Sequence, residues 1–196
     1  MTSVIRWGLW VACGLPGLIL VWHWQTGQLG VVPDEALLHR TGRFALLFLM
    51  STLGLGFVQA FVNWRPLYAA RRPIGVWTFL YASAHAMVWL FLDQSGILEF
   101  AWAEMRQMLH VKLGIAGLLL MLPLAITSVD IAPRLLGFKL WKRLHLLVWP
   151  AALVVIAHTW VVSRFQSPLV IVLTFIIIFL LASRLYAARL NAKTKA

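Results

Sequence analysis

Three histidines, His85, His145 and His158, lie inside strongly apolar stretches of the chain. An ionisable ring in hydrocarbon is costly, so such residues need a partner and indicate a functional site. Neutral imidazole is also the commonest metal ligand among side chains. His145 and His158 are 13 residues apart, which on one helix is about 20 Å, or two-thirds of the hydrocarbon core of a bilayer. Histidines at two depths suggest redox centres that carry electrons across a membrane.

The composition is that of a polytopic membrane protein. Of the 196 residues, 62% are hydrophobic and 12% are charged, whereas soluble domains have about 25% charged residues. Cys13 is the only cysteine, so the chain has neither an intramolecular disulfide nor a Cys-x-x-Cys pair for zinc or an iron–sulfur cluster. We expect a single integral membrane domain over 1–196.

Six apolar stretches are long enough to cross a membrane, at about 20 residues per helix. We predict an all-α membrane protein, a six-helix bundle with spans at 5–24, 44–63, 74–92, 113–129, 144–163 and 168–187. Arg72 and Pro73 are expected to open the third span. Pro150 is expected to bend the fifth, which carries both His145 and His158.

The basic residues predict the orientation. One side of the membrane receives the amino terminus, the 64–73 and 130–143 loops and the carboxyl-terminal tail. Twelve of the 17 basic residues lie there: Arg6, Arg65, Arg71, Arg72, Arg134, Lys139, Lys142, Arg143, Arg184, Arg189, Lys193 and Lys195. By the positive-inside rule this side is cytoplasmic, so both termini are expected in the cytoplasm. The net charge of +11 is then a topology signal; lipid is the expected partner and nucleic acid is not.

This orientation places His85 and His158 at similar depth on different helices. A low-spin b-type haem takes an axial ligand on each side of its ring, so the two imidazoles can ligate one haem iron. One alternative is that each ring hydrogen-bonds a neighbouring helix, as polar residues in membrane bundles do. Another is a histidine proton relay in a proton-coupled transporter.

His145 has no evident partner for the same role. The positions 13 and 14 residues before His85 hold arginines, which are not ordinary haem ligands. A basic cluster at the same membrane face consists of Arg71, Arg72, Lys142 and Arg143. Such a cluster suits haem propionates or a flavin phosphate, or it is plain positive-inside anchoring. His39 and His110 are expected at the outer surface.

Five segments in a fixed order carry a resemblance to a known family over nearly the whole chain. They are HRTGRFAL at 39–46, RRPIG at 71–75, ASAH at 82–85, LAITS at 124–128 and LGFKLWKRLH at 136–145. The chain resembles the MsrQ (YedZ) family, the haem-binding membrane subunits of periplasmic protein-methionine-sulfoxide reductase systems. That family is part of the ferric-reductase-like transmembrane group, which includes the NADPH oxidases.

The resemblance implies haem b, one or two per chain, and FMN as a further cofactor. It implies His85, His158 and His145 as the ligands. In larger relatives the third and fifth spans each carry two histidines and bind two stacked haems, whereas here the inner histidine of the third span is missing. This departure leaves two alternatives for the inner site, a haem with a different second ligand or a flavin.

The resemblance also implies a function. The chain is expected to pass electrons from the quinone pool or a flavin reductase to a periplasmic molybdopterin-containing methionine sulfoxide reductase, which repairs oxidised proteins. No Gly-x-Gly-x-x-Gly motif is present, so the electron donor is expected to be external. No residue arrangement suggests a sulfoxide-reducing site in the chain itself. A stand-alone metalloreductase is the alternative within the same group.

Overall fold

The computed structural model describes residues 2–59, 61–62 and 64–193, which form helices and turns without a strand. Six helical segments of this part are long and apolar enough to cross a membrane. The predicted fold class, an all-α six-helix membrane bundle, is therefore confirmed. The expectation of one domain over 1–196 includes residues 1, 60, 63 and 194–196, among them Lys195, which lie outside the described residues.

The helices have the following bounds. The longer ones are α1 (Thr2–Gln25), α2 (Pro33–Val58), α3 (Arg65–Val88), α4 (Leu98–Gln107), α5 (Leu109–Ile126), α8 (Val148–Val162) and α9 (Pro168–Lys193). The shorter ones are the π-helical turn η1 (Trp89–Asp93), α6 (Ala132–Leu136), α7 (Phe138–Leu144) and the 3₁₀ turn η2 (His145–Leu147).

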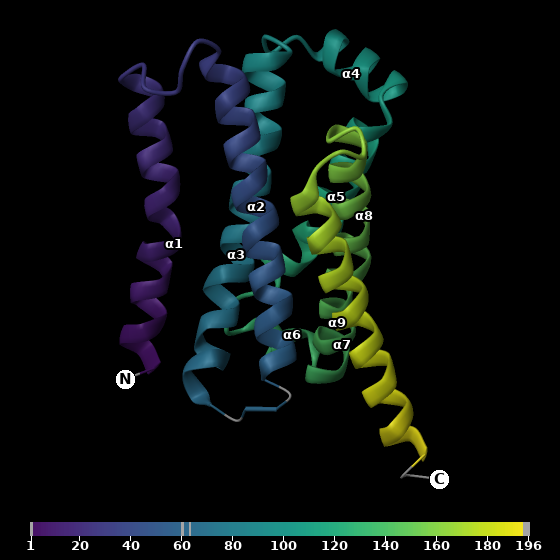
Figure 1. Ribbon diagram of the computed structural model, residues 1–196. Coiled ribbons are helices and arrows are strands. Elements are labelled where there is room, and N and C mark those ends of the chain that lie inside the picture. Colours follow the sequence, from purple (N-terminus) through teal and green to yellow (C-terminus); the bar gives the residue numbers. More distant parts are fainter. Residues whose placement is uncertain (1, 60, 63, 194–196) are drawn as a thin grey trace.

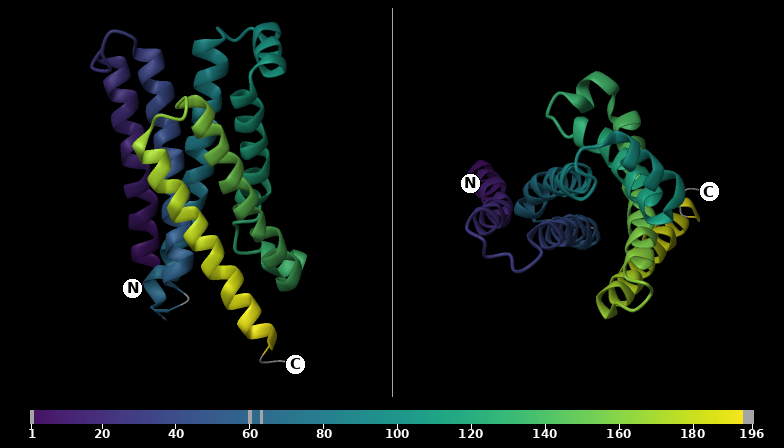
Figure 2. Two further views of the ribbon diagram at one scale, coloured as in Figure 1. Left: turned by 45° about the vertical axis from the view of Figure 1, so that its right-hand side comes forward. Right: turned by 90° about the horizontal axis from the view of Figure 1, so that it is seen from above.

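Seen from above, the helices form two groups (Figure 2). One group consists of α1, α2 and α3, and the other of α5, α8 and α9, with α6 and α7 at its lower end. The first turn of α1 and the last turn of α9 lie at the same end of the bundle as the end of α2, the start of α3 and α7, whereas α4 lies at the opposite end (Figure 1). The segments assigned to the basic side by charge counting thus lie at one end.

The predicted start of the third span at Arg72-Pro73 is wrong. The helix α3 begins at Arg65 and contains Pro73. Pro66 takes the first-turn position, where a missing N–H costs no hydrogen bond. Pro73 lies inside the helix and is fully buried; neighbouring helices allow such interruptions in membrane proteins.

The fifth span is not one continuous helix. His145 ends α7 and begins η2, so it lies in a different helical segment from His158 in α8. Pro150 has no N–H to offer the carbonyl of Leu146, four residues before it, which explains a tighter turn there. Both histidines nevertheless lie in one candidate membrane-spanning segment, Phe138–Val162, which the 3₁₀ turn divides.

Other span ends also differ from the predicted ones. The second helix covers 33–58 instead of 44–63, and the fourth covers 109–126 instead of 113–129. Thr127 and Ser128 end the fourth helix, because their hydroxyls donate to the carbonyls of Pro123 and Leu124. The early start of α2 brings residues 39–43, part of the first family segment, into the helix.

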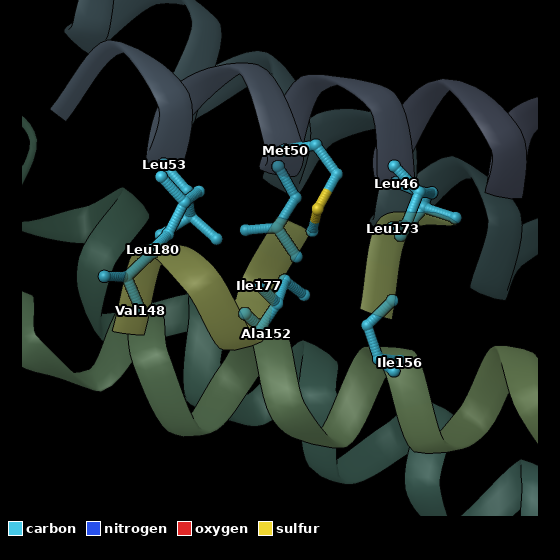
Figure 3. Packing of buried hydrophobic residues seen from close by; sticks show 10 residues of the cluster. Leu46, Met50, Leu53, Val148, Ala152, Ile156, Leu173, Ile177 and Leu180 are labelled. Atoms are coloured by element: carbon cyan, nitrogen blue, oxygen red, sulfur yellow. The ribbon is translucent and has the colours of Figure 1, made fainter. Parts of the chain in front are cut away.

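A buried cluster joins the two helix groups (Figure 3). It consists of Leu46, Leu49, Met50 and Leu53 from α2, Val148, Ala152 and Ile156 from α8, and Leu173, Ile177 and Leu180 from α9. Ile177 is 1% exposed. Because lipid tails are as apolar as these side chains, close packing rather than burial from water stabilises the contact.

Candidate functional site

His85 of α3 and His158 of α8 come from the two different helix groups and meet between them. Their ring centroids are 6.2 Å apart and their ring planes are inclined by 83°. Both side chains are partly buried. The sequence placed these two residues at a similar depth, and the structure brings them together.

Each ring is oriented by one backbone carbonyl of a neighbouring helix. Nδ1 of His85 is 2.9 Å from the carbonyl oxygen of Leu38 in α2. Nδ1 of His158 is 2.7 Å from the carbonyl oxygen of His110 in α5. A carbonyl only accepts, so Nδ1 carries the proton in both rings, and the lone pair of each neutral ring is on Nε2. This tautomer is the one in which metal-ligating histidines are usually held.

The spacing of the two rings fits two ligands of one metal atom. Imidazole binds metals at about 2.0 Å through nitrogen, and the ring centre is about 1.1 Å further, so two opposed rings have centres about 6 Å apart. The observed 6.2 Å agrees with this value. Within the described chain, no cluster of three or more His, Cys, Asp or Glu side chains can hold a metal ion. His85 and His158 are thus two candidate donors from different helices.

The hydrogen bonds to Leu38 and His110 also match the alternative raised from the sequence, in which each histidine bonds a neighbouring helix. That alternative accounts for Nδ1 of each ring. It does not explain why two such rings from different helix groups have their centroids 6.2 Å apart, the separation expected for two ligands of one metal atom. The arrangement can hold a metal-centred cofactor between α3 and α8.

His110 lies closer to the pair than the sequence suggested. Its ring centroid is 6.3 Å from that of His158, and the residue is half-buried instead of fully at the surface. Its Nε2 is 3.9 Å from Glu104 of α4, which also accepts a hydrogen bond from the indole of Trp89 at 3.0 Å. These contacts fix α4 and the start of α5 beside His158. His39, by contrast, is exposed as expected.

His145 lies away from the His85–His158 pair, at the end of the bundle that carries α7. Its Nδ1 is 3.0 Å from the carbonyl oxygen of Trp141, one turn earlier, and its ring centroid is 4.3 Å from the Trp141 indole. The carbonyl again places the proton on Nδ1 and leaves Nε2 as the lone-pair nitrogen. Among the described residues, no second histidine faces it.

Arg71 lies within electrostatic range of His145 and of Arg184 in α9. Its guanidinium packs beside Gly56 of α2, where an added Cβ would be 3.4 Å from Cζ. In the described part of the chain, Arg71 has no ion-pair or hydrogen-bond partner. Arg184 lies over the Trp149 ring, 5.4 Å from its centroid, and the buried Trp149 Nε1 has no acceptor among the described residues. The guanidinium groups of Arg71 and Arg184 and the indole N–H of Trp149 can bind an anionic group.

The other three members of the predicted basic cluster are placed differently. Arg72 forms an ion pair with Asp130, which Arg6 of α1 also approaches at 3.9 Å. Lys142 and Arg143 are exposed on α7 and make no ion pair within the described residues. Of these four residues the structure associates only Arg71 with His145, and it places Arg184, which no sequence pattern indicated, near Arg71.

A family model described as "Ferric reductase like transmembrane component" matches residues 41–156. The chain is also 33% identical over 186 residues to a protein of Rhodospirillum rubrum, covering 93% of this chain and 88% of the relative. That relative is named "Protein-methionine-sulfoxide reductase heme-binding subunit MsrQ". The chain belongs to the MsrQ family of ferric-reductase-like membrane proteins.

Two further MsrQ proteins support the family. A relative from Azospira oryzae is 33% identical over 163 residues, covering 83% of this chain and 70% of its own length. One from Xanthomonas oryzae pv. oryzae is 34% identical over 151 residues, covering 74% and 69%. The matched segment 41–156 contains His85 and His145 and ends two residues before His158.

The sequence did not indicate the groups that hold the two rings. Every residue type has a backbone carbonyl, so no side-chain signal marks those of Leu38 and His110. Gly42 and Gly114, which lie against the two rings, are a signal that was available but was not used. A glycine within a helix costs stability and therefore indicates a close approach.

Proposed function

We propose that this protein is a haem b membrane subunit that passes electrons to a periplasmic methionine sulfoxide reductase. The observation that carries the proposal is the His85–His158 pair, with ring centroids 6.2 Å apart and Nδ1 of each ring on a backbone carbonyl. Membership of a family whose relatives are named heme-binding subunits supports it. A bound haem supplies one-electron chemistry.

The residues of the chain supply the ligands, the ligand orientation and a low-dielectric site. The imidazoles of His85 and His158 would hold a haem, and the carbonyls of Leu38 and His110 would keep the rings in the tautomer that leaves Nε2 free to bind it. Because the ligands come from α3 and α8, the packing of the two helix groups fixes their separation.

A second cofactor site is proposed at the opposite end, formed by His145 with Arg71. The 14 residues from Arg71 to His85 span about 20 Å of helix, so the two sites lie at different depths of the membrane. Of the other residues assigned from the sequence, Arg72, Lys142 and Arg143 support this site only through their charge at the same face. The occupant is a second haem or FMN, and the cations favour its anionic groups.

The orientation follows from the charges. The end that carries α7 and the chain termini is proposed to be cytoplasmic, in the bacterial inner membrane, because most of the basic residues lie there. The His85–His158 pair then lies nearer the periplasm. Electrons would enter from the quinone pool or a flavin reductase and leave to a periplasmic molybdopterin-containing subunit that performs the sulfoxide reduction.

The first prediction tests this direction. In membranes, a quinol or a reduced flavin should reduce the haem, and addition of the periplasmic catalytic subunit with methionine sulfoxide should reoxidise it. The reason is that the proposed redox ligands lie near both ends of the described bundle, whereas the sulfoxide chemistry is assigned to the catalytic subunit. The reduced α-band is followed over time by absorbance, with methionine in place of its sulfoxide, and omission of the subunit, as controls.

Two outcomes would contradict the proposal. Reoxidation by ferric chelates alone, without any response to subunit and sulfoxide together, would indicate a metalloreductase. A purified protein without a Soret band would indicate that the histidines serve proton transport instead.

The second prediction concerns the inner site. His145→Ala should lower the content of the second haem or of FMN and leave the His85–His158 haem unchanged, because the two sites share no ligand. Extracted haem and flavin per protein, with reduced spectra, measure this. His39→Ala, which removes an exposed ring, is the control. One haem, no flavin and unchanged electron transfer in His145→Ala would show that His145 has no cofactor role.

A further inference from the structure

The His85 ring reaches the backbone of α2 beside a glycine. Its Nδ1 donates to the carbonyl of Leu38, and the ring lies against Gly42, four residues later. A Cβ built on Gly42 would be 3.0 Å from His85 Nδ1 and 3.1 Å from Cε1. Ordinary contacts between such atoms are about 3.5–4.0 Å, so no side chain fits there without moving the ring.

The His158 ring reaches α5 in the same way. Its Nδ1 donates to the carbonyl of His110, and the ring lies against Gly114, again four residues later. A Cβ on Gly114 would be 3.2 Å from His158 Cε1 and 3.3 Å from Nδ1. The same offset between carbonyl and glycine thus occurs for both histidines, in the helix pairs α2–α3 and α5–α8. It also occurs between α1 and α3, where Trp77 and Tyr81 donate to the carbonyls of Trp10 and Cys13 beside Gly14 and Gly17.

Helix geometry explains this offset. The carbonyl of residue i points along the axis to the N–H of residue i+4, and each Cα–Cβ bond tilts back toward the amino terminus. A side chain at i+4 therefore covers one flank of that carbonyl. A ring from a neighbouring helix reaches the second lone pair of the carbonyl on that flank more closely when residue i+4 lacks a side chain.

We propose that Gly42 and Gly114 are positioning residues of the haem site, each admitting one ligand imidazole to the backbone carbonyl four residues before it. The inference rests on the proposed function, because it takes His85 and His158 as the haem ligands. The two glycines together would fix the 83° angle between the ring planes. The two hydrogen bonds raise the basicity of the ligands, which favours ferric over ferrous iron and lowers the midpoint potential.

The test compares Gly42→Ala and Gly114→Ala with the unchanged protein. Each methyl group displaces a ring from its carbonyl but removes no ligand, so haem content should stay near the unchanged level. The ferric low-spin EPR g-values should shift, because they depend on the angle between the imidazole planes. The midpoint potential should rise, and more for Gly42→Ala, whose Cβ is nearer to Nδ1.

Two glycines of the same helices serve as matched controls. Gly117 of α5 also faces α8, but a Cβ there would be 3.0 Å from Val155 Cγ2 instead of a histidine. Gly117→Ala therefore strains the same interface as strongly without touching a ligand. Gly54 of α2 has nothing within 4 Å of an added Cβ. Both variants should keep the EPR spectrum and the potential of the unchanged protein.

The inference is overturned if Gly42→Ala and Gly114→Ala leave the EPR spectrum and the potential unchanged, or if Gly117→Ala shifts them equally. Circular dichroism and gel filtration verify that each variant is folded. If one alanine variant does not fold, the other decides, since its ring contact involves a different helix pair. Retention of the low-spin haem in His85→Ala would overturn the proposed function itself, whereas unchanged glycine variants overturn only this inference.

Discussion

His85→Ala and His158→Ala should each abolish one low-spin haem. Each variant removes an imidazole that a helix carbonyl holds in place. The ring of His110 has its centroid 6.3 Å from that of His158, and its Nε2 is 3.9 Å from Glu104. We expect the haem content to fall by one per chain, and the remaining spectrum to be that of the inner cofactor alone. Extracted haem per protein and reduced-minus-oxidised spectra measure the change.

The matched control for these variants is again His39→Ala. His39 lies at the same end of the bundle, but its side chain is exposed, and its Nε2 is 3.5 Å from Glu35. Its removal should leave both haem content and spectra unchanged. Unaltered stoichiometry and spectra in both His85→Ala and His158→Ala would refute the pairing, whatever the family membership.

Ile177→Ala should destabilise the protein by about 1–2 kcal/mol. The substitution removes three carbons from the cluster that joins α2, α8 and α9. In the core of a water-soluble protein, removing each carbon from water stabilises the fold by about 0.8 kcal/mol. A bundle in lipid lacks this contribution, because lipid tails are as apolar as the core. The free-energy cost of the cavity remains. This cost is the smaller part of the roughly 2–5 kcal/mol by which such truncations destabilise soluble cores.

Ile178→Ala provides the control, because the neighbouring isoleucine is 56% exposed on the outside of the bundle. It loses the same atoms but leaves no cavity. Thermal unfolding in detergent, followed by the Soret band, should show a lower midpoint for Ile177→Ala alone, since the cluster holds the two helix groups and hence the two ligands together. Equal midpoints for the two variants would show that the cluster does not determine this stability.

The sequence determined the class of protein and the number of helices. Apolar stretches of about 20 residues can satisfy their backbone polar groups in lipid only as helices, so the composition alone predicted the six-helix bundle that the structure has. Histidines inside such stretches are costly enough to be selected without any structure. The order of five short segments indicated the family, which the comparisons confirm.

The helix ends and the interruptions were less predictable. Pro73 resembles a helix start in the sequence but lies inside α3, because Pro66 already provides one. The 3₁₀ turn at His145 separates it from His158. In both cases the local signal was a proline, and proline is compatible both with a helix start and with an interruption that neighbouring helices tolerate.

Only the tertiary structure decided which groups meet. Which face of α3 turns to α8, and which glycine lies opposite each ring, depends on the packing of helices far apart in the sequence. The hydrogen bonds from His85 to Leu38 and from His158 to His110 use backbone carbonyls, which every residue has. Arg71 and Arg72 are adjacent in the sequence, yet one lies near His145 and the other pairs with Asp130, because successive residues of a helix point about 100° apart.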